Sequence, residues 1–297
     1  MGDLSVDTAV EPLGGGRYRA KMSPDWAIWG PMGGYVASMA LRAAGAESSF
    51  GRPASFFCHY LGVAALDEEV DLEVSRLRGG RNAEAFRVSM TQGPKAILEA
   101  TVWTIAEVDG LVHDVSVPPE VPGPDDLRNM GELMPEGSGP PFPFWNNFEV
   151  KPVTWTPDWP PPEPREPRWR QWLRFAPAPT FGDPWVDACR ALVVIDVQCW
   201  PAAVPQHAWK WGQQQEWMAP SLDLYVAFHH PRPDAEWLLA DGHAPIAADG
   251  LIGWTGRMWS TDGTLVASGG GQLLCRRLSG TTPAGNPGPT APPDSTR

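Results

Sequence analysis

Asp196 is the residue of this sequence whose type and surroundings most directly suggest chemistry. It lies in the run ALVVIDVQCW, where its neighbours at helical spacing are apolar: Leu192, Val193, Cys199 and Trp200. A carboxylate on an apolar face is costly unless it is paired or used, because burial disfavours the charged form. The pattern therefore predicts either a group that accepts a proton from water or holds it, or a structural acid that caps a turn or pairs with an arginine such as Arg190.

Gln272 follows three consecutive glycines, residues 269–271, in the strand-like stretch LVASGGGQLL. Glycine weakens a strand interior because it brings no side chain to pack. A bulge could turn the amide of Gln272 into a pocket, with bare backbone leaving room for a ligand; the alternative is a solvent-facing Gln272 on an edge strand. Ser221, after Pro220 at another strand start, is a candidate hydroxyl group or a turn residue, and Asp223 would share its face.

Other catalytic chemistries have weaker support in the sequence. No GxSxG motif is present and no cysteine–histidine pairing is suggested, so a covalent serine or cysteine hydrolase is not expected. The adjacent His229 and His230 would point to opposite faces of a strand and could not easily bind one metal ion. The four cysteines form no CxxC pair and are expected to be reduced. We therefore predict no metal and no redox cofactor.

Two dense blocks of sequence, about 1–117 and 168–279, would position these residues. In the first block, PMGGYVASMALRAAG has apolar residues at helical spacing and Gly45 to close the helix. In the second block, DPWVDACRALVVIDVQCW is the expected helix, with Asp183 or Asp187 near its start. Strand-like runs follow each helix, at 53–64, 68–78, 82–92 and 95–105 in the first block and at 221–230, 236–244, 251–260 and 264–274 in the second.

The two blocks are related by an internal repeat. The separation between His59 and Gly93 is 34 residues, and the separation between His229 and Gly263 is the same. Each histidine follows an aromatic-containing apolar run, and each glycine lies in the last expected hairpin. We predict an α+β protein in which each block is one helix and about five antiparallel strands, with the sheet wrapping the helix to bury its apolar face.

This arrangement resembles the hotdog fold, doubled within one chain, and specifically the acyl-CoA thioesterase II family. The matching stretches are Gly33–Gly34, SFFCHYLG and RNAEAFRV in the first block, and IDVQCWP, SLDLYVAFHHPRPDAEWLL and STDGTLVAS in the second. The resemblance implies two antiparallel sheets, each wrapping a central helix and joined into one long sheet. It also implies that the working site lies in the C-terminal half, and the first helix stretch, PMGGYVASMALRAA, carries no Asp, Glu or His that could serve a site of its own.

In the family, an aspartate, a hydroxyl residue and a glutamine orient water against a thioester. The resemblance assigns these roles to Asp196, Ser221 and Gln272, although Gln272 comes one residue late and the other register puts Gly271 at that position. The resemblance thus implies an enzyme that hydrolyses acyl-CoA or a related acyl thioester. The alternative is a non-catalytic acyl-CoA or lipid-binding protein with a degraded site, whereas a hydratase or dehydratase is disfavoured because neither expected helix carries a histidine.

Three glycines are predicted to contact the substrate, namely Gly33, Gly34 and Gly271. Gly33 and Gly34 open the first helix, where free N–H groups could bind an oxyanion or a phosphate. The alternative for this pair is close packing between helices. Gly271 would leave room for an acyl chain.

The net charge and the composition of the chain limit its expected partners and location. A net charge of −12 disfavours nucleic-acid binding, which needs a basic face. No 18-residue apolar run and no apolar N-terminal region are seen, so we predict a cytoplasmic protein without membrane contact. The sequence is compatible with homo-oligomers.

Residues 118–167 are predicted to be a Pro/Trp-rich linker that packs through its tryptophans, because 18 of the 34 prolines fall within 118–184. Residues 280–297 are predicted to be a disordered tail.

Overall fold

The computed structural model describes residues 1–134, 140, 142–156, 161–207 and 216–278. The predicted tail, 280–297, lies outside the described residues. In the described chain, the N-terminal half contains α1 (Leu4–Asp7), β1 (Glu11–Gly14), β2 (Arg17–Lys21), α2 (Gly33–Glu47), β3 (Arg52–Tyr60), β4 (Glu69–Gly79), β5 (Ala83–Gln92) and β6 (Lys95–Ile105).

The C-terminal half repeats this order. It contains α3 (Met130–Leu133), β7 (Phe148–Pro152), β8 (Arg168–Phe175), α4 (Pro184–Asp196), α5 (Cys199–Ala203), β9 (Trp217–Met218), β10 (Asp223–Phe228), β11 (Trp237–Ala248), β12 (Leu251–Ser260), β13 (Leu265–Leu274) and β14 (Arg276–Arg277). The predicted repeat is confirmed, because strand, long helix and four strands follow one another in both halves. The turns that carry Gly93 and Gly263 both place glycine at positive φ, +55° and +82°.

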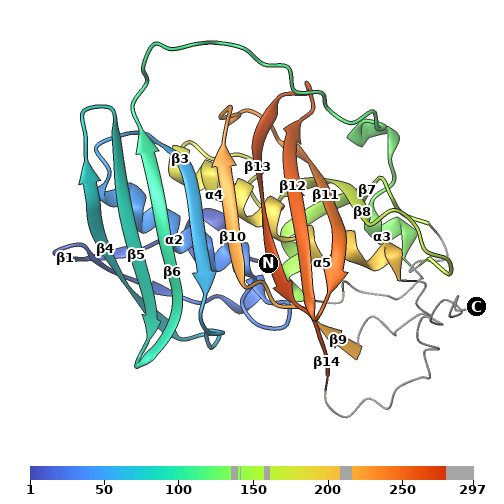
Figure 1. Cartoon of the computed structure of the whole chain (residues 1–297), viewed down its shortest axis with the longest axis horizontal. Helices are drawn as coiled ribbons and strands as arrows, with labels where there is room; N and C mark the ends of the chain where they lie inside the picture. Colours follow the sequence, from blue (N-terminus) through green and yellow to red (C-terminus); the bar gives the residue numbers. More distant parts are fainter. Residues whose placement is uncertain (135–139, 141, 157–160, 208–215, 279–297) are drawn as a thin grey trace, which may run out of the picture.

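The strands form one continuous antiparallel sheet rather than two. Its order is β1-β2-β4-β5-β6-β3-β10-β13-β12-β11-β8-β7, and a separate pair joins β9 to β14 (Figure 1). The halves meet at β3 and β10, which pair from Ser55 opposite Ala227 to His59 opposite Asp223. The prediction of two sheets is therefore corrected, and the prediction that they join into one long sheet is met. Backbone hydrogen bonds between the halves leave neither central strand with an open edge.

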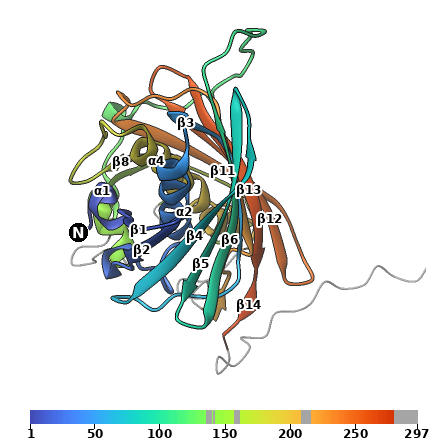
Figure 2. The ribbon, with the colours of Figure 1, turned by 90° about the vertical axis from the view of Figure 1, so that its left-hand side faces the viewer.

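The two long helices, α2 and α4, lie on one face of this sheet (Figure 2). They run antiparallel, because Gly34 of α2 packs on the backbone of Leu192 and Gly45 packs on the indole of Trp185. Helix α2 continues to Glu47, so the prediction that Gly45 ends it was wrong. The absence of a side chain at Gly45 is explained by the Trp185 ring, which lies 2.4 Å from the point where a Cβ would be.

Helix α4 is preceded by a polar N-cap and is buried in the core. The side chain of Asp183 accepts hydrogen bonds from the N–H groups of Trp185 and Val186, which is the N-cap expected before Pro184. The segment Pro184–Gln206 is long and apolar enough to cross a membrane by length and composition, with a mean hydropathy of 1.2 over 18 residues. It is not an unbroken apolar run, because Asp187, Arg190 and Asp196 lie within it. Because 83% of that window is buried within the protein, we interpret the segment as the core helix α4 together with the short helical turns that follow it.

The predicted linker is more structured than expected. Within it, β7 pairs with β8 and forms one edge of the sheet, a position that tolerates proline. Trp145 packs against Phe144 and Phe148 of the same segment, and Phe144 in turn contacts Trp26 of the N-terminal half. The predicted boundaries of the linker, 118 and 167, stay a prediction.

Candidate active site

Asp196 is the last residue of α4 and is 4% exposed. Its Oδ2 accepts a hydrogen bond of 2.9 Å from the N–H of Gly34, and its Oδ1 accepts one of 2.9 Å from the hydroxyl of Ser221. Ser221 lies just before β10 and bridges to Leu273 of β13. Two of the residues predicted from the sequence, far apart in the chain, therefore meet in space.

The alternative structural role for Asp196, a pair with Arg190, is not observed. The buried Arg190 forms its ion pair with Asp187 at 2.5 Å, one helical turn away from its own position. It also donates to the carbonyl groups of Pro179, Ala235 and Arg232. Among the residues that the structure describes, no basic side chain forms an ion pair with Asp196.

The start of α2 is brought onto the end of α4 by a glycine. A Cβ on Gly34 would lie 2.4 Å from the carbonyl oxygen of Leu192, so only glycine permits this approach. The first N–H groups of a helix have no partner within the helix and carry its positive dipole end. The N-terminal half thus stabilises a carboxylate that belongs to the C-terminal half.

Burial governs the acidity of Asp196. It raises the pKa of this carboxyl to about 6, although the hydrogen bonds from Ser221 and Gly34 act in the opposite direction. The group is therefore mostly ionised at neutral pH and still basic enough to accept a proton. This combination is what a general base requires.

Three further side chains lie around the carboxylate, and of these only Cys199 could be placed near Asp196 from the sequence. Cys58 and Tyr60 belong to β3, and Cys199 opens α5. Burial is the largest cause that raises the pKa of all three groups, and the charge of Asp196 raises each further, so they stay protonated. Nothing in the local sequence HYLG distinguishes Tyr60 from an ordinary strand residue, because its place depends on the β3–β10 pairing.

Gln272 lies apart from this group. On β13, Leu273 is fully buried and a Cβ on Gly269 would lie 3.1 Å from Ile195 of α4, so these odd-numbered residues face the helices. The alternation of a strand then places Gly271 on the helix-facing side and Gln272 on the opposite, exposed side. The side chain of Gln272 makes no hydrogen bond with any described residue, and its N–H donates to Asp223 at 2.9 Å.

The run of three glycines has a packing explanation. Strand β13 lies between β10 and β12 and pairs with β12 in unbroken register from Ala267 to Leu274, so the run is neither a bulge nor an edge strand. Cβ atoms would lie 2.0 Å from the Tyr225 carbonyl oxygen at Gly269, 2.4 Å from that of Trp254 at Gly270 and 2.4 Å from that of Asp223 at Gly271. The neighbouring strands approach too closely for any side chain.

The two glycines at the start of α2 differ in whether their N–H groups have a hydrogen-bond partner. The N–H of Gly34 is used by Asp196, whereas the N–H of Gly33 donates to no described residue. Both explanations of this pair from the sequence therefore apply in part. Gly34 allows the helices to pack, and Gly33 keeps an unused donor at a helix start.

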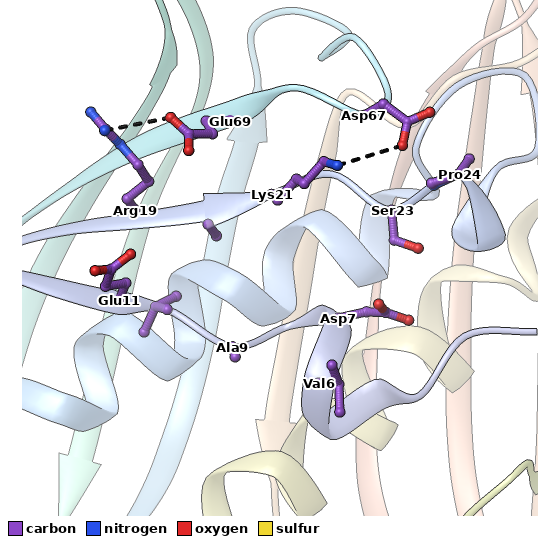
Figure 3. A pocket seen from close by; sticks show the side chains of 12 residues that line it. Val6, Asp7, Ala9, Glu11, Arg19, Lys21, Ser23, Pro24, Asp67 and Glu69 are labelled. Carbon is purple, nitrogen blue, oxygen red and sulfur yellow. Dashed lines mark ion pairs between the residues drawn. The ribbon is translucent and has the colours of Figure 1, made fainter.

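A hollow of about 550 Å³ lies elsewhere, between the N-terminal segment and β2 (Figure 3). Its two cations are engaged, since Arg19 lies 3.4 Å from Glu69 and Lys21 lies 3.9 Å from Asp67. None of the site residues that were predicted from the sequence lines this hollow. We therefore locate the candidate site at Asp196 and not in this hollow.

Comparison with protein families identifies both halves. Residues 22–105 match the acyl-CoA thioesterase N-terminal domain, and residues 122–273 match the acyl-CoA thioesterase C-terminal domain. The second match begins within the predicted linker and includes β7.

Solved structures share the same fold over almost the whole chain. An acyl-CoA thioesterase II, TesB2, from Mycobacterium marinum has a TM-score of 0.75 and 23% identity, covering 94% of this chain and 100% of its own. A tesB protein from Mycobacterium avium subs paratuberculosis has a TM-score of 0.72 and 23% identity, covering 92% and 98%. A protein of unknown function with a hot dog fold from Alicyclobacillus acidocaldarius has a TM-score of 0.74 and 20% identity, covering 94% and 98%. The α+β double-hotdog architecture is thereby confirmed.

Proposed function

The chain belongs to the acyl-CoA thioesterase II family, and on this premise we propose that Asp196 and Ser221 hold and activate the water that hydrolyses its acyl-CoA substrate. The products are a free acid and coenzyme A. The observation that carries this proposal is the buried carboxylate of Asp196, which has two hydrogen-bond donors and no cationic partner among the described residues. A purely structural acid in such a place would be expected to have a neutralising partner.

The reaction needs one proton acceptor and one oxyanion donor. Water attacks the thioester carbonyl carbon, and as the C–O bond forms, a proton passes from the water to Asp196 while the carbonyl electrons move to oxygen. The carbonyl then re-forms, the C–S bond breaks, and the proton passes from Asp196 to the departing sulfur. The unused N–H of Gly33 is the proposed donor to the oxyanion, and the Ser221 oxygen can accept from the attacking water.

The third predicted member, Gln272, has less support. Its exposed side chain would have to cross β13 to join Asp196, so its catalytic role stays a prediction. The same holds for substrate contact by Gly271 and Gly34. The predicted cytoplasmic location and the pairing of chains into homo-oligomers are likewise retained as proposals.

One observation favours a second candidate function. Gly271 has no side chain and therefore places no side-chain amide on the helix-facing side of β13. A site that lacks the catalytic glutamine is what a non-catalytic acyl-CoA-binding protein would have. This candidate retains the fold and the ligand but not the hydrolysis. It predicts binding of acyl-CoA without release of thiol.

The deciding experiment is a free-thiol release assay with acyl-CoAs of increasing chain length, on the wild type and on Asp196→Asn. We expect release by the wild type and little release by the variant. Full activity of Asp196→Asn would refute the site. A wild type that binds acyl-CoA, measured by calorimetry, but releases no thiol from any of them would establish the binding protein instead.

A further inference from the structure

The hydroxyl of Tyr60 is buried and makes no hydrogen bond of normal geometry with any described residue. The polar group beside it is the thiol of Cys58, which is only a weak hydrogen-bond partner. Such a hydroxyl is uncommon, because a hydroxyl removed from water without a partner loses free energy that a phenylalanine would not lose. The buried tyrosine of α2 behaves differently. The hydroxyl of Tyr35 accepts from the Ser23 N–H at 2.9 Å and donates to the Asp7 carbonyl oxygen at 3.0 Å.

The Tyr60 hydroxyl lies beside the candidate active site. A Cβ on Gly33 would be 3.0 Å from the Tyr60 oxygen and 2.7 Å from Oδ2 of Asp196, so both oxygens approach the same side of this residue. The position of Tyr60 is fixed by the seam between the halves, since its N–H donates to the Leu222 carbonyl oxygen at 2.9 Å, next to Ser221. Three segments therefore bring a carboxylate, a phenol and the unused N–H of Gly33 close together.

We propose that Tyr60 is a catalytic residue of the thioesterase, whose hydroxyl donates a hydrogen bond to the thioester oxygen as negative charge develops on it. This inference rests on the proposed function and extends it. The phenol stays protonated through the reaction, and the proton of the water still passes to Asp196 and then to sulfur. Tyr60 and the Gly33 N–H would together form the pair of donors that an oxyanion requires.

The chemistry of a phenol suits this place. Burial, the neighbouring Cys58 thiol and the Asp196 charge raise the pKa of Tyr60 well above its ordinary value, so the group remains a protonated donor at neutral pH. The donor is supplied by β3 of the N-terminal half, whereas the resemblance assigned the amide to β13 of the C-terminal half. The proposal therefore explains how a site can work with Gly271 where a glutamine was expected.

Three tyrosine variants test the proposal in the thiol release assay. Tyr60→Phe should lower kcat about 100-fold with KM little changed, because the lost donor acts on the oxyanion and not on the bound substrate. Tyr225→Phe is the matched control, since this tyrosine of the adjacent strand is 46% exposed, and its kcat should equal that of the wild type. Thermal unfolding separates a structural role: Tyr60→Phe should have a Tm no lower than the wild type, whereas Tyr35→Phe should have a lower one.

Several outcomes would overturn the proposal. A Tyr60→Phe enzyme with wild-type kcat refutes it. If Gln272→Ala loses activity in that case, the third catalytic residue beside Asp196 and Ser221 is Gln272. A marked fall in the Tm of Tyr60→Phe would mean that the hydroxyl stabilises the fold. A wild type without thioesterase activity removes the proposed function and this inference with it, so the two failures are distinguishable.

Discussion

The two ends of the α2–α4 helix pair are related by the internal repeat, yet they differ in what they bury. At one end, Gly34 exposes its N–H to Asp196, which has no cationic partner among the described residues. At the other end, the ring of Trp185 covers Gly45. The polar group there is Glu84, which is 3% exposed and fully engaged.

Glu84 shows what a structural acid looks like in this protein. It accepts a hydrogen bond of 2.8 Å from the N–H of Ser49 and lies 3.5 Å from Arg76. The hydroxyl of Ser48 also contacts it while donating to Thr104. The fold can therefore pair a buried carboxylate near a helix end with a cation, as it pairs Glu84 with Arg76, and it does not do so at Asp196.

The largest effect that would test this comparison is on activity. Asp196→Asn should reduce kcat/KM by about 100-fold or more, because the amide cannot accept a proton from water. Glu84→Gln is the matched variant at the other end and should leave kcat/KM unchanged while lowering stability. Thiol release by both variants is the measurement, and equal losses of activity would erase the distinction between the ends.

The next effect is on stability and separates two kinds of helix contact. Gly34→Ala should destabilise the protein by about 3 kcal/mol, because its Cβ meets the backbone of Leu192 and the helices must move apart. Gly45→Ala should cost only about 1 kcal/mol, since the Trp185 side chain can shift. Urea unfolding of both variants measures this, and the reverse order would contradict the packing described here.

A smaller loss is expected from Ser221→Ala. The hydroxyl holds Oδ1 of Asp196 but does not itself take the proton, so kcat should fall about tenfold rather than 100-fold. Steady-state kinetics at neutral pH test this expectation. A loss as large as that of Asp196→Asn would mean that Ser221 is as important for the proton transfer as Asp196.

The smallest effect is a displacement of the pH profile. Because the active form of Asp196 is ionised and its pKa is raised to about 6, the kcat/KM of the wild type should fall as the pH drops through about 6. The Ser221 hydrogen bond lowers this pKa, so in Ser221→Ala the acidic limb should move to higher pH. An unmoved limb in that variant would mean that another group controls it.

Much of the fold could be predicted because the signals are local. Apolar periodicity marks α2 and α4, alternation marks the strands, and the equal spacing of His59–Gly93 and His229–Gly263 reveals the repeat. The family resemblance added the pairing of Asp196 with Ser221, which the geometry then brought together. Residues 118–167 were harder to predict, because their proline content indicates an extended chain but not that β7 forms an edge strand of the sheet.

Which residues carry charge, and where most of the helices and strands lie, can be read from side-chain type and spacing along the chain. Which of these residues meet depends on how the segments pack. The face of β13 that turns toward α4 depends on register, and this put Gly271 inside and Gln272 outside. The raised pKa of Asp196 and the position of the Tyr60 hydroxyl depend on burial and on the pairing of β3 with β10, so neither can be predicted from the residues adjacent in the sequence.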